Sequence, residues 1–375
     1  MYIDTPYILI AFMISSFCGF LLTPLILNFC KRKGLYDIPN FRKVHETRIP
    51  RLGGVIFFPC TFIAFLIVCY MTQVYQQGNI TLSLWTVYFL IGSSLIYWIG
   101  IIDDVIGLNA QVKLFVQILS ASAFPLSGLY VNNLYGLFGI YEIPFYIGAP
   151  LTVLFVSYVS NTINLIDGID GLAASMSLVS LFGFAYYYIQ WGLMQYVVLI
   201  VALIGAIVAF LYFNLFGKVE KNRKIFMGDT GSLTIGFVLA FLSLKLSMIN
   251  EALRPFPDNG LLISFTLLVI PVFDAIRVSV VRMYHRRSPM NPDKNHIHHK
   301  LLRAGCSNSQ VLFVVVGLSL FYICYNFGLS YCFDISISVI VILDMICYVV
   351  FHQIINKMIK HNHQKVVVFE NDDDV

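Results

Sequence analysis

The sequence predicts an all-α, polytopic integral membrane protein. Of its 375 residues, 58% are hydrophobic and only 12% are charged, which is about half the charged fraction of a typical soluble protein. No charged residue occurs from position 52 to 102, or from 172 to 217. Apolar runs of about 18 residues or more are typical of transmembrane helices, and each charge-free stretch is long enough for two. The composition therefore excludes a soluble globular protein, and no nucleic-acid partner is expected.

Eleven membrane-spanning helices follow from a span length of about 20 residues. We expect them near positions 6–30, 53–73, 82–102, 112–128, 145–163, 171–190, 194–213, 231–249, 260–283, 310–329 and 334–356. The fourth is the least secure, because it is short and precedes an apolar loop at 128–144, so that ten spans stay open as an alternative. The first span has no basic segment before it and no cleavage site, which predicts a retained helix rather than a signal peptide. We expect one transmembrane domain over 1–360 and a disordered acidic cytoplasmic tail over 361–375.

The distribution of Lys and Arg predicts the orientation of these spans. Of the 24 such residues, only Lys245 and Arg254 belong to loops on one side of the predicted topology. The other 22 lie in, or border, loops on the opposite side. Because Lys and Arg concentrate in cytoplasmic loops, that side is expected to be cytoplasmic. The N-terminus is then outside and the C-terminus is cytoplasmic.

The unusual polar clusters all fall at cytoplasmic ends of predicted spans. They are the acidic pair at 103–104, the stretch 161–171, the loop 228–232 and the histidines at 296–299. Ionisable groups at or within a membrane are candidate functional groups. A cation-coupled transporter is the rival hypothesis, but its ion-binding acids are expected near the bilayer midplane and accessible from both sides. Clustering at one interface favours an enzyme, with a lipid-phosphate phosphatase as a second enzymatic alternative.

The first cluster, Asp103-Asp104, directly follows the third apolar span. Adjacent carboxylates at the C-terminal end of a helix repel each other and are disfavoured by the helix dipole. Such a pair needs a counter-charge, which a divalent cation or Lys113 would supply. The alternative is a pair of solvated loop acids that mark the end of the helix.

The second cluster contains Asn161, Asn164, Asp167 and Asp170 at steps of three residues. Neighbours in this series share a helix face, but all four align only if the helix tightens or breaks. We expect a break at Gly168, with the fifth span ending near Asp167 and the sixth beginning near Asp170. The alternative is that Asp170 caps a helix and the asparagines cap or pack the helix before it.

The third cluster, Gly228-Asp229-Thr230-Gly-Ser, precedes the eighth span. Backbone N–H groups and hydroxyls at the start of a helix suit an anion such as phosphate. Asp229 would repel that phosphate unless a metal lies between them, so Asp229 with Mg²⁺ is a coherent phosphate site. The alternative is an ordinary Gly/Ser-rich helix cap beside the positive charges of residues 218–224.

The fourth cluster consists of His296, His298 and His299 in a basic loop. No Cys accompanies them, so a zinc site is not specified, and the basic neighbours suit a nucleotide pyrophosphate better. Arg51, with Gly53 and Gly54 behind it, ends the first cytoplasmic loop and is a further candidate for substrate contact. A solvated basic loop is the alternative in both places. The acids and cations together suggest hard-cation chemistry on phosphates.

These motifs, in this order, resemble those of the polyprenyl-phosphate N-acetylhexosamine-1-phosphate transferases. The resemblance covers about residues 37–303 and rests on four elements: Asp103-Asp104, Asn161-xx-Asn164-xx-Asp167-Gly-x-Asp170-Gly-Leu-Ala, Phe226-Met-Gly-Asp229-Thr-Gly-Ser and His296-Ile-His298-His299-Lys. The histidine loop and the Arg42-Lys43-x-His45…Pro50-Arg51-Leu52-Gly53-Gly54 segment are similar to the WecA-like branch, which makes lipid-linked sugars for surface polysaccharides.

The resemblance implies a reaction and its partners. A UDP-N-acetylhexosamine, with UDP-GlcNAc as the first expectation, and undecaprenyl phosphate would give a lipid-pyrophosphoryl-sugar and UMP. Mg²⁺, with Mn²⁺ as the alternative, would be the cofactor. A single displacement is expected, with a covalent aspartyl-phosphate as the alternative. The setting would be the cytoplasmic face of a bacterial inner membrane, at the first membrane step of cell-envelope polysaccharide synthesis, and a homodimer is compatible with it.

The resemblance also assigns roles to the site residues. Asp229, helped by Asn164, would hold the metal against the diphosphate. Asp103 and Asp104 would orient or deprotonate the lipid phosphate. The expected catalytic residues are Asp103, Asp104, Asp167, Asp170 and His298. The expected substrate contacts are Lys113, Asn161, Gly228, Thr230, His296, His299 and Arg51.

Overall fold

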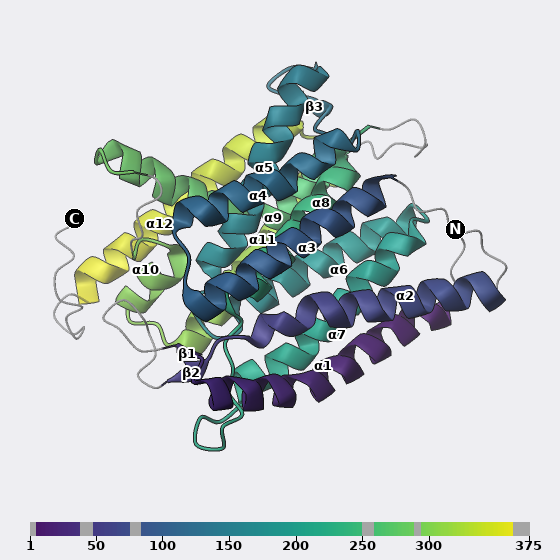
Figure 1. The fold of residues 1–375 in the computed structure, drawn as a ribbon. Helices are drawn as coiled ribbons and strands as arrows, with labels where there is room; N and C mark the ends of the chain where they lie inside the picture. Colours follow the sequence, from purple (N-terminus) through teal and green to yellow (C-terminus); the bar gives the residue numbers. More distant parts are fainter. Residues whose placement is uncertain (1–4, 38–47, 76–83, 250–258, 289–293, 363–375) are drawn as a thin grey trace.

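A computed structural model describes residues 5–37, 48–75, 84–249, 259–288 and 294–362, and these are almost entirely helical. The helices are α1 (Thr5–Lys33), α2 (Phe57–Tyr75), α3 (Leu84–Ile106), α4 (Ala110–Leu126), α5 (Phe145–Ile166), α6 (Leu172–Gln190), α7 (Met194–Phe216), α8 (Gly228–Ser247), α9 (Gly260–Tyr284), α10 (Ile297–Arg303), α11 (Asn308–Phe333) and α12 (Ile337–Asn362). A 3₁₀ turn, η1, covers Gly53–Ile56, and two antiparallel pairs complete the fold: β1 (Tyr36–Asp37) with β2 (Ile49–Pro50), and β3 (Asn133–Leu137) with β4 (Ile140–Glu142). The predicted all-α polytopic class is confirmed (Figure 1).

Ten helical spans among these residues are long and apolar enough to cross a membrane. The fourth predicted span corresponds to α4, which is shorter, with 17 residues or ~25 Å at 1.5 Å per residue. α4 packs between α3 and α5. Since α3 and α5 both end at the same face of the bundle, α4 is the segment that returns the chain across it. An eleventh crossing by α4 stays a prediction, because α4 falls below the usual span length.

Different polar contacts connect the helices at the two ends of the bundle. At one end, Lys113 at the start of α4 joins the end of α3 to the start of α8. At the other end, Asn132 exchanges hydrogen bonds of 2.6 and 2.9 Å with Ile249, and the Phe138 N–H donates to Ser338 at 2.8 Å. The first end is called the site face below, and the second the hairpin face, after the β3–β4 hairpin.

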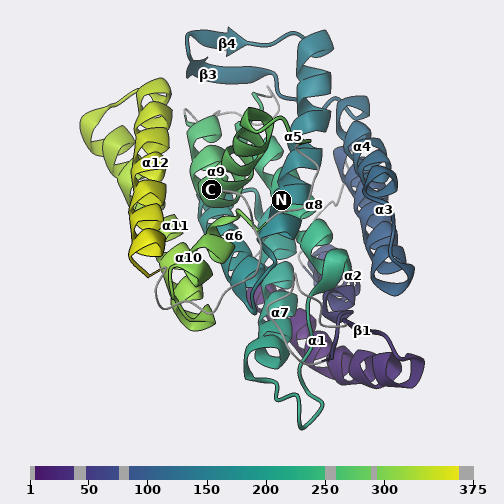
Figure 2. The same ribbon diagram turned by 90° about the vertical axis from the view of Figure 1, so that its left-hand side faces the viewer.

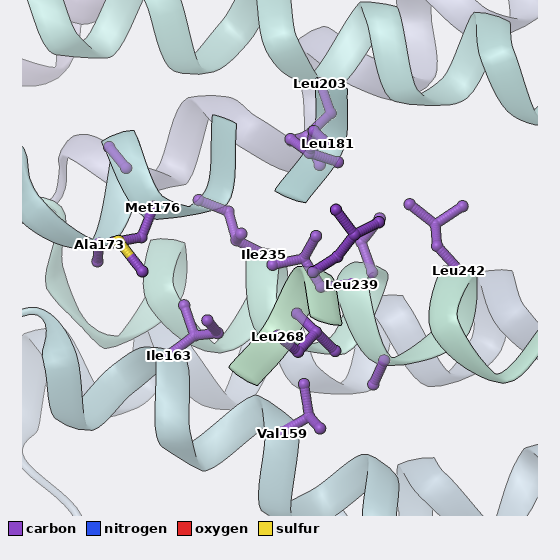
Figure 3. Packing of buried hydrophobic residues seen from close by; sticks show 14 of the residues in the cluster. Val159, Ile163, Ala173, Met176, Leu181, Leu203, Ile235, Leu239, Leu242 and Leu268 are labelled. Carbon is purple, nitrogen blue, oxygen red and sulfur yellow. The ribbon is translucent and has the colours of Figure 1, made fainter. Parts of the chain in front are cut away.

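Helix α8 forms the centre of the bundle. Every residue from Thr230 to Ser247 is buried, and Figure 2 shows α11 and α12 on one side of it and α3 and α4 on the other. Small residues permit this close packing, because a Cβ on Gly236 would lie only 2.7 Å from the Cα of Ser160 in α5. The apolar contacts around α8 are drawn in Figure 3, which labels Ile235, Leu239 and Leu242 of α8 among side chains of α5, α6, α7 and α9.

The outer helices are buried less within the protein than α8 is. In α1, α11 and α12, only 22%, 28% and 22% of the most apolar window is buried within the protein. Their exposed side chains are mostly large and apolar, as lipid-facing surfaces require. The central helix, α8, begins at the site face and is surrounded by other helices along its whole length.

Candidate active site

A cavity of about 460 Å³ opens at the site face between the ends of α5, α7 and α8. Segments far apart in the sequence contribute to its wall. The lining residues are Asp37, Arg51, Asp104, Asn164, Asp167, Gly168, Ile169, Asp170, Asn214, Phe226, Met227, Gly228, Asp229, His299 and Asn308. All four predicted polar clusters therefore contribute to one cavity.

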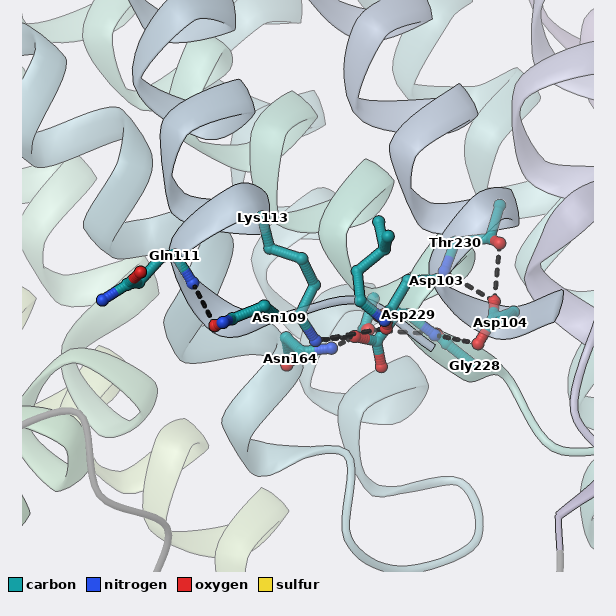
Figure 4. A network of polar contacts seen from close by, with 11 residues as sticks. Asp103, Asp104, Asn109, Gln111, Lys113, Asn164, Gly228, Asp229 and Thr230 are labelled. Carbon is teal, nitrogen blue, oxygen red and sulfur yellow. Dashed lines mark hydrogen bonds and ion pairs between the residues drawn. The ribbon is translucent and has the colours of Figure 1, made fainter. Parts of the chain in front are cut away.

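Asp104 binds the N-terminal end of α8. Its Oδ1 accepts from the Asp229 N–H at 2.9 Å, and its Oδ2 accepts from the Thr230 N–H at 2.9 Å and the Thr230 hydroxyl at 2.6 Å (Figure 4). The first N–H groups of a helix have no partners within the helix, and a carboxylate there is also favoured by the helix dipole. Gly228 has φ +74°, and a Cβ there would meet the Arg51 carbonyl and Asp104. Asp104 thus fixes where α8 begins.

Asp103 points away from Asp104, toward α4. Its Oδ1 accepts from the Leu108 N–H at 2.7 Å, and its Oδ2 lies 3.1 Å from Nζ of Lys113. The same Nζ lies 2.7 Å from Oδ2 of Asp229. The counter-charge predicted for the acidic pair is therefore supplied by Lys113, which joins two carboxylates from different helices.

The turn after α5 follows the predicted break. α5 ends at Ile166 with Asp167 as its C-cap, and Gly171, at φ +75°, precedes α6. α6 begins at Leu172, so Asp170 is not in its first turn as predicted. Asp170 instead forms an ion pair of 2.6 Å with Lys224. This pairing positions the loop that precedes α8.

Asp167 lines the cavity with an unusual protonation equilibrium. Burial, reinforced by the negative charges of Asp229, Asp104 and Asp170, raises the pKa of Asp167 to about 8. A raised pKa favours the protonated carboxyl group, which is a hydrogen-bond donor. Beside it, the Asn164 amide donates to the Ser232 hydroxyl of α8 at 2.8 Å.

The histidine segment is organised by Asp274 near the end of α9. The carboxylate of Asp274 contacts Arg277 at 2.9 Å, as expected for an i,i+3 pair, and Nδ1 of His296 at 2.8 Å. His298 is buried against the turn after α5, where a Cβ on Gly168 would lie 2.2 Å from its Nε2. Burial and the neighbouring His299 and His296 hold the pKa of His298 well below its ordinary value. His298 is therefore neutral, and His299 is the member that lines the cavity.

The structure brings most predicted site residues together. Eight of the fourteen line the cavity: Arg51, Asp104, Asn164, Asp167, Asp170, Gly228, Asp229 and His299. Five others lie immediately behind these: Asp103, Lys113, Thr230, His296 and His298. Asn161 is exposed on α5 and does not line the cavity. Arg42, Lys43, His45 and most of the predicted tail (363–375) lie outside the described residues.

Sequence reasoning missed several polar residues of the wall, among them Asn214 at the end of α7. The Asn214 amide Nδ2 donates to the Ile225 carbonyl at 2.9 Å. Its Oδ1 is buried and has no hydrogen-bond partner within the described part of the chain. A buried carbonyl oxygen without a partner is unusual in a folded protein, and this one belongs to a residue of the cavity wall. The only feature of the sequence that could have indicated Asn214 is its position near the end of a span without charged residues.

The oxygen groups around Lys113 have the chemistry of a hard-cation site. Asp103, Asp229 and Asn164 offer carboxylate and amide oxygens, the ligands that Mg²⁺ prefers. A cation, the Lys113 ammonium, already lies between the two carboxylates. Over the described ranges, no three His, Cys, Asp or Glu side chains are grouped as a ready-made metal cage. The donor set fits a divalent ion that is held jointly with a substrate rather than by protein alone.

Comparisons with known proteins give a consistent result. Residues 86–247 match the model of glycosyl transferase family 4. The chain is 33% identical over 290 residues to an undecaprenyl-phosphate alpha-N-acetylglucosaminyl 1-phosphate transferase of Yersinia pestis, covering 76% of this chain and 74% of the relative. It is 29% identical over 310 residues to the Escherichia coli protein of the same name, covering 80% of this chain and 78% of that relative. A probable undecaprenyl-phosphate N-acetylglucosaminyl 1-phosphate transferase of Bacillus subtilis is 29% identical over 316 residues, covering 82% and 81%.

Proposed function

The chain belongs to glycosyl transferase family 4, and we propose that it transfers N-acetylglucosamine-1-phosphate from UDP-GlcNAc to undecaprenyl phosphate. The observation that carries the proposal is the convergence of the ends of α3, α5 and α8 on one acid-lined cavity at a single face. Relatives that carry this activity by name align over most of the chain. The alternative of a cation-coupled transporter has no such support.

The proposed reaction is a phosphoryl transfer between two phosphate groups. An oxygen of the lipid phosphate attacks the sugar-bearing phosphorus of the UDP-sugar, and the bond from that phosphorus to the UMP oxygen breaks. Because the second pKa of a phosphate monoester is about 6, the nucleophile is already mostly dianionic at neutral pH. The chain's task is then to align the phosphates and to neutralise their charge. Lys113, which contacts Asp229, supplies positive charge next to the cavity wall, and Asp167 lines the cavity.

Asp103 is the proposed orienting group for the lipid phosphate. It lies at the end of α3, and Lys113 is shared between it and Asp229. A small shift of the Lys113 side chain toward a phosphate would leave Asp103 and Asp229 free to receive another cation. Asp104 contributes differently, since both of its oxygens are occupied by α8.

Mg²⁺ is the proposed cofactor, with Mn²⁺ as the alternative. Asp229 and Asn164 would hold it, and it would supply positive charge against the diphosphate. The rest of the cavity wall suits the nucleotide-sugar. Asn214 and His299 line the cavity with polar side chains, and Lys224 brings a positive charge to Asp170 of the wall. Hydroxyl, amide and uracil N–H groups of the UDP-sugar are the matching donors and acceptors.

The site face is proposed to be cytoplasmic in a bacterial inner membrane. Residues 218–224, which flank the cavity, hold four of the Lys and Arg residues, and short loops rich in these residues stay in the cytoplasm. This orientation gives the cavity access to a soluble nucleotide-sugar, while the lipid phosphate reaches it from the bilayer.

The deciding assay uses purified, folded protein in detergent with UDP-GlcNAc, undecaprenyl phosphate and Mg²⁺. We expect release of UMP and formation of the lipid-pyrophosphoryl-sugar. UDP-GalNAc in place of UDP-GlcNAc tests the identity of the sugar. Release of inorganic phosphate from undecaprenyl phosphate without a UDP-sugar tests the phosphatase alternative. Absence of UMP with every UDP-N-acetylhexosamine would refute the proposal.

Asp229→Asn should abolish turnover, because the amide removes the negative charge that would hold the metal. Binding of Mn²⁺ in the presence of UDP-GlcNAc, followed by electron paramagnetic resonance, should weaken at least about tenfold, since even changes behind a metal ligand typically cost that much. Asp334→Asn is the matched control, because Asp334 is exposed at the end of α11 with φ +51°, a conformation that Asn readily adopts. Full activity in Asp229→Asn would remove this residue from the site.

A further inference from the structure

The last helix, α12, carries one buried stripe that reaches toward the site face. Ile340, Asp344, Tyr348, His352 and Ile355 are all at most 5% exposed, whereas their neighbours on the other faces of the helix face outward. The spacing of about four residues places them on one side of a helix. Polar residues in such a stripe within a span are costly and indicate specific partners.

Each polar member of the stripe meets a different part of the bundle. Asp344 accepts from the Asn326 amide of α11 at 2.8 Å, which ties α12 to α11. One turn further on, the Tyr348 hydroxyl donates to Oδ1 of Asp274 in α9 at 3.2 Å. The Tyr348 ring is held between Phe273 and His352, with ring centroids 5.6 and 4.6 Å away. Tyr348 therefore has little freedom to point elsewhere.

Asp274 connects Tyr348 to the histidine segment. Besides Tyr348, the Asp274 carboxylate accepts from Arg277 and His296, and from the Ile297 N–H at 3.0 Å. Ile297 is the first residue of α10, whose own N-cap residue, His296, makes no side-chain cap. Asp274 thus supplies from α9 the acceptor and the negative charge that the start of a seven-residue helix lacks.

Two side chains of α10 connect this helix to the cavity. His298 packs against Gly168 in the turn after α5, and His299 lines the cavity wall. The His296 and His298 rings are nearly parallel, at 8° and 6.1 Å between centroids. A shift at the start of α10 would therefore move both His298 and His299 relative to Asp167.

We propose that Tyr348 of α12 is a positioning residue for the nucleotide-sugar site, acting through Asp274 to hold the His296–His299 segment in place. This inference rests on the proposed function, which puts the nucleotide-sugar in the cavity beside His299. Tyr348 itself does not line the cavity and is linked to it through the segment that carries His299. Its effect should therefore fall on binding of the nucleotide-sugar.

Tyr348→Phe tests the inference, because it removes one hydroxyl and keeps the ring. We expect the KM for UDP-GlcNAc to rise on the order of tenfold, the scale of one hydrogen bond to a charged group. The kcat and the KM for undecaprenyl phosphate should stay within about twofold. Tyr70→Phe is the matched control, since Tyr70 is 67% exposed on α2 and should behave as wild type. Asp274→Asn should raise the KM for UDP-GlcNAc further than Tyr348→Phe does.

The outcomes separate this inference from the proposed function. Wild-type protein without turnover refutes the proposed function itself. Active wild type together with an unchanged KM for UDP-GlcNAc in Tyr348→Phe refutes only the positioning role. A general loss of activity in Tyr348→Phe, with both KM values, kcat and the unfolding temperature all altered, would show that the hydroxyl serves folding alone and would also refute the role.

Discussion

Lys113 and Gly168 show how single residues set the geometry of this site. Lys113 neutralises carboxylates from α3 and α8 at the same time, so the cluster is stable only while a cation lies between them. Gly168 acts by its small size, because it leaves space for the His298 ring. The His298 ring occupies the space where any larger residue at position 168 would place its Cβ. One residue supplies charge at the site and the other supplies space.

Gly168→Ala should reduce turnover and stability together. The added Cβ would lie 2.2 Å from Nε2 of His298, whose buried ring has no room to move away. Overpacking of this kind costs about 1–3 kcal/mol, and we expect turnover to fall in proportion. Thermal unfolding in detergent and steady-state UMP release measure the two effects.

The control for that substitution is Gly317→Ala in α11. No atom lies within 4 Å of the Cβ position there, and the residue is inside a helix. Alanine should therefore stabilise the helix by up to about 1 kcal/mol and leave turnover unchanged. Wild-type activity in Gly168→Ala would mean that His298 moves freely, which contradicts the packing described here.

Among the elements, α10 is the one most dependent on its surroundings. A seven-residue helix is too short to be stable alone, and it is held by α9, α11 and α12. Burial within this frame also lowers the pKa of Lys300 to about 8, with Arg277 and Arg303 adding to the effect. The site therefore includes a short helix whose charges are tuned by the helices around it.

The stability of this frame should depend on pH through His298. Its folded pKa lies well below 6.5, so the folded chain keeps His298 neutral while the unfolded chain takes up a proton as pH falls through about 6.5. Proton binding to the unfolded state alone lowers the free energy of unfolding, by up to about 1.4 kcal/mol per pH unit. Stability is thus complete above that pH and is lost below it.

His298→Gln should remove this part of the pH dependence. Unfolding temperatures measured from pH 8 to 5 should fall less steeply for this variant than for wild type, whatever its stability at pH 8. His361→Gln, at the exposed end of α12, is the control and should keep the wild-type slope. Parallel slopes for His298→Gln and wild type would contradict a buried neutral imidazole.

For the whole molecule, the arrangement of helices places the cavity at one face and the β3–β4 hairpin at the other. α3 and α5 end beside α8 at the site face, and the hairpin between α4 and α5 contacts the start of α12 at the opposite face. Charged and polar cluster residues are thereby confined to one face. The two faces must lie on different sides of the membrane if α4 crosses it.

Cysteine labelling tests this topology. In a chain whose eight cysteines are replaced by alanine, Tyr141→Cys on the hairpin should react with a membrane-impermeant maleimide in intact cells. Lys221→Cys, in the exposed loop between α7 and α8, should react only after lysis. Labelling of both positions in intact cells would contradict the separation of the two faces by the spans α5, α6 and α7. The reverse pattern would invert the orientation.

The sequence by itself determined the class, the spans and the site face. Hydropathy and charge are local properties, so they predict which segments cross and which loops share a side. The break at Gly168 was also predictable, since two glycines follow a long apolar helix. The four clusters could be assigned to one face for the same reason, because each one ends or begins a span.

Only the tertiary structure decided which polar groups meet. Asp103 and Asp104 are adjacent in sequence, yet one binds Lys113 and the other caps α8. Asn214 and Tyr348 look like ordinary span residues until α7 and α12 are packed in place. Such pairings depend on the rotation and depth of neighbouring helices, which are set by close contacts such as that between Gly236 and Ser160 and not by hydropathy.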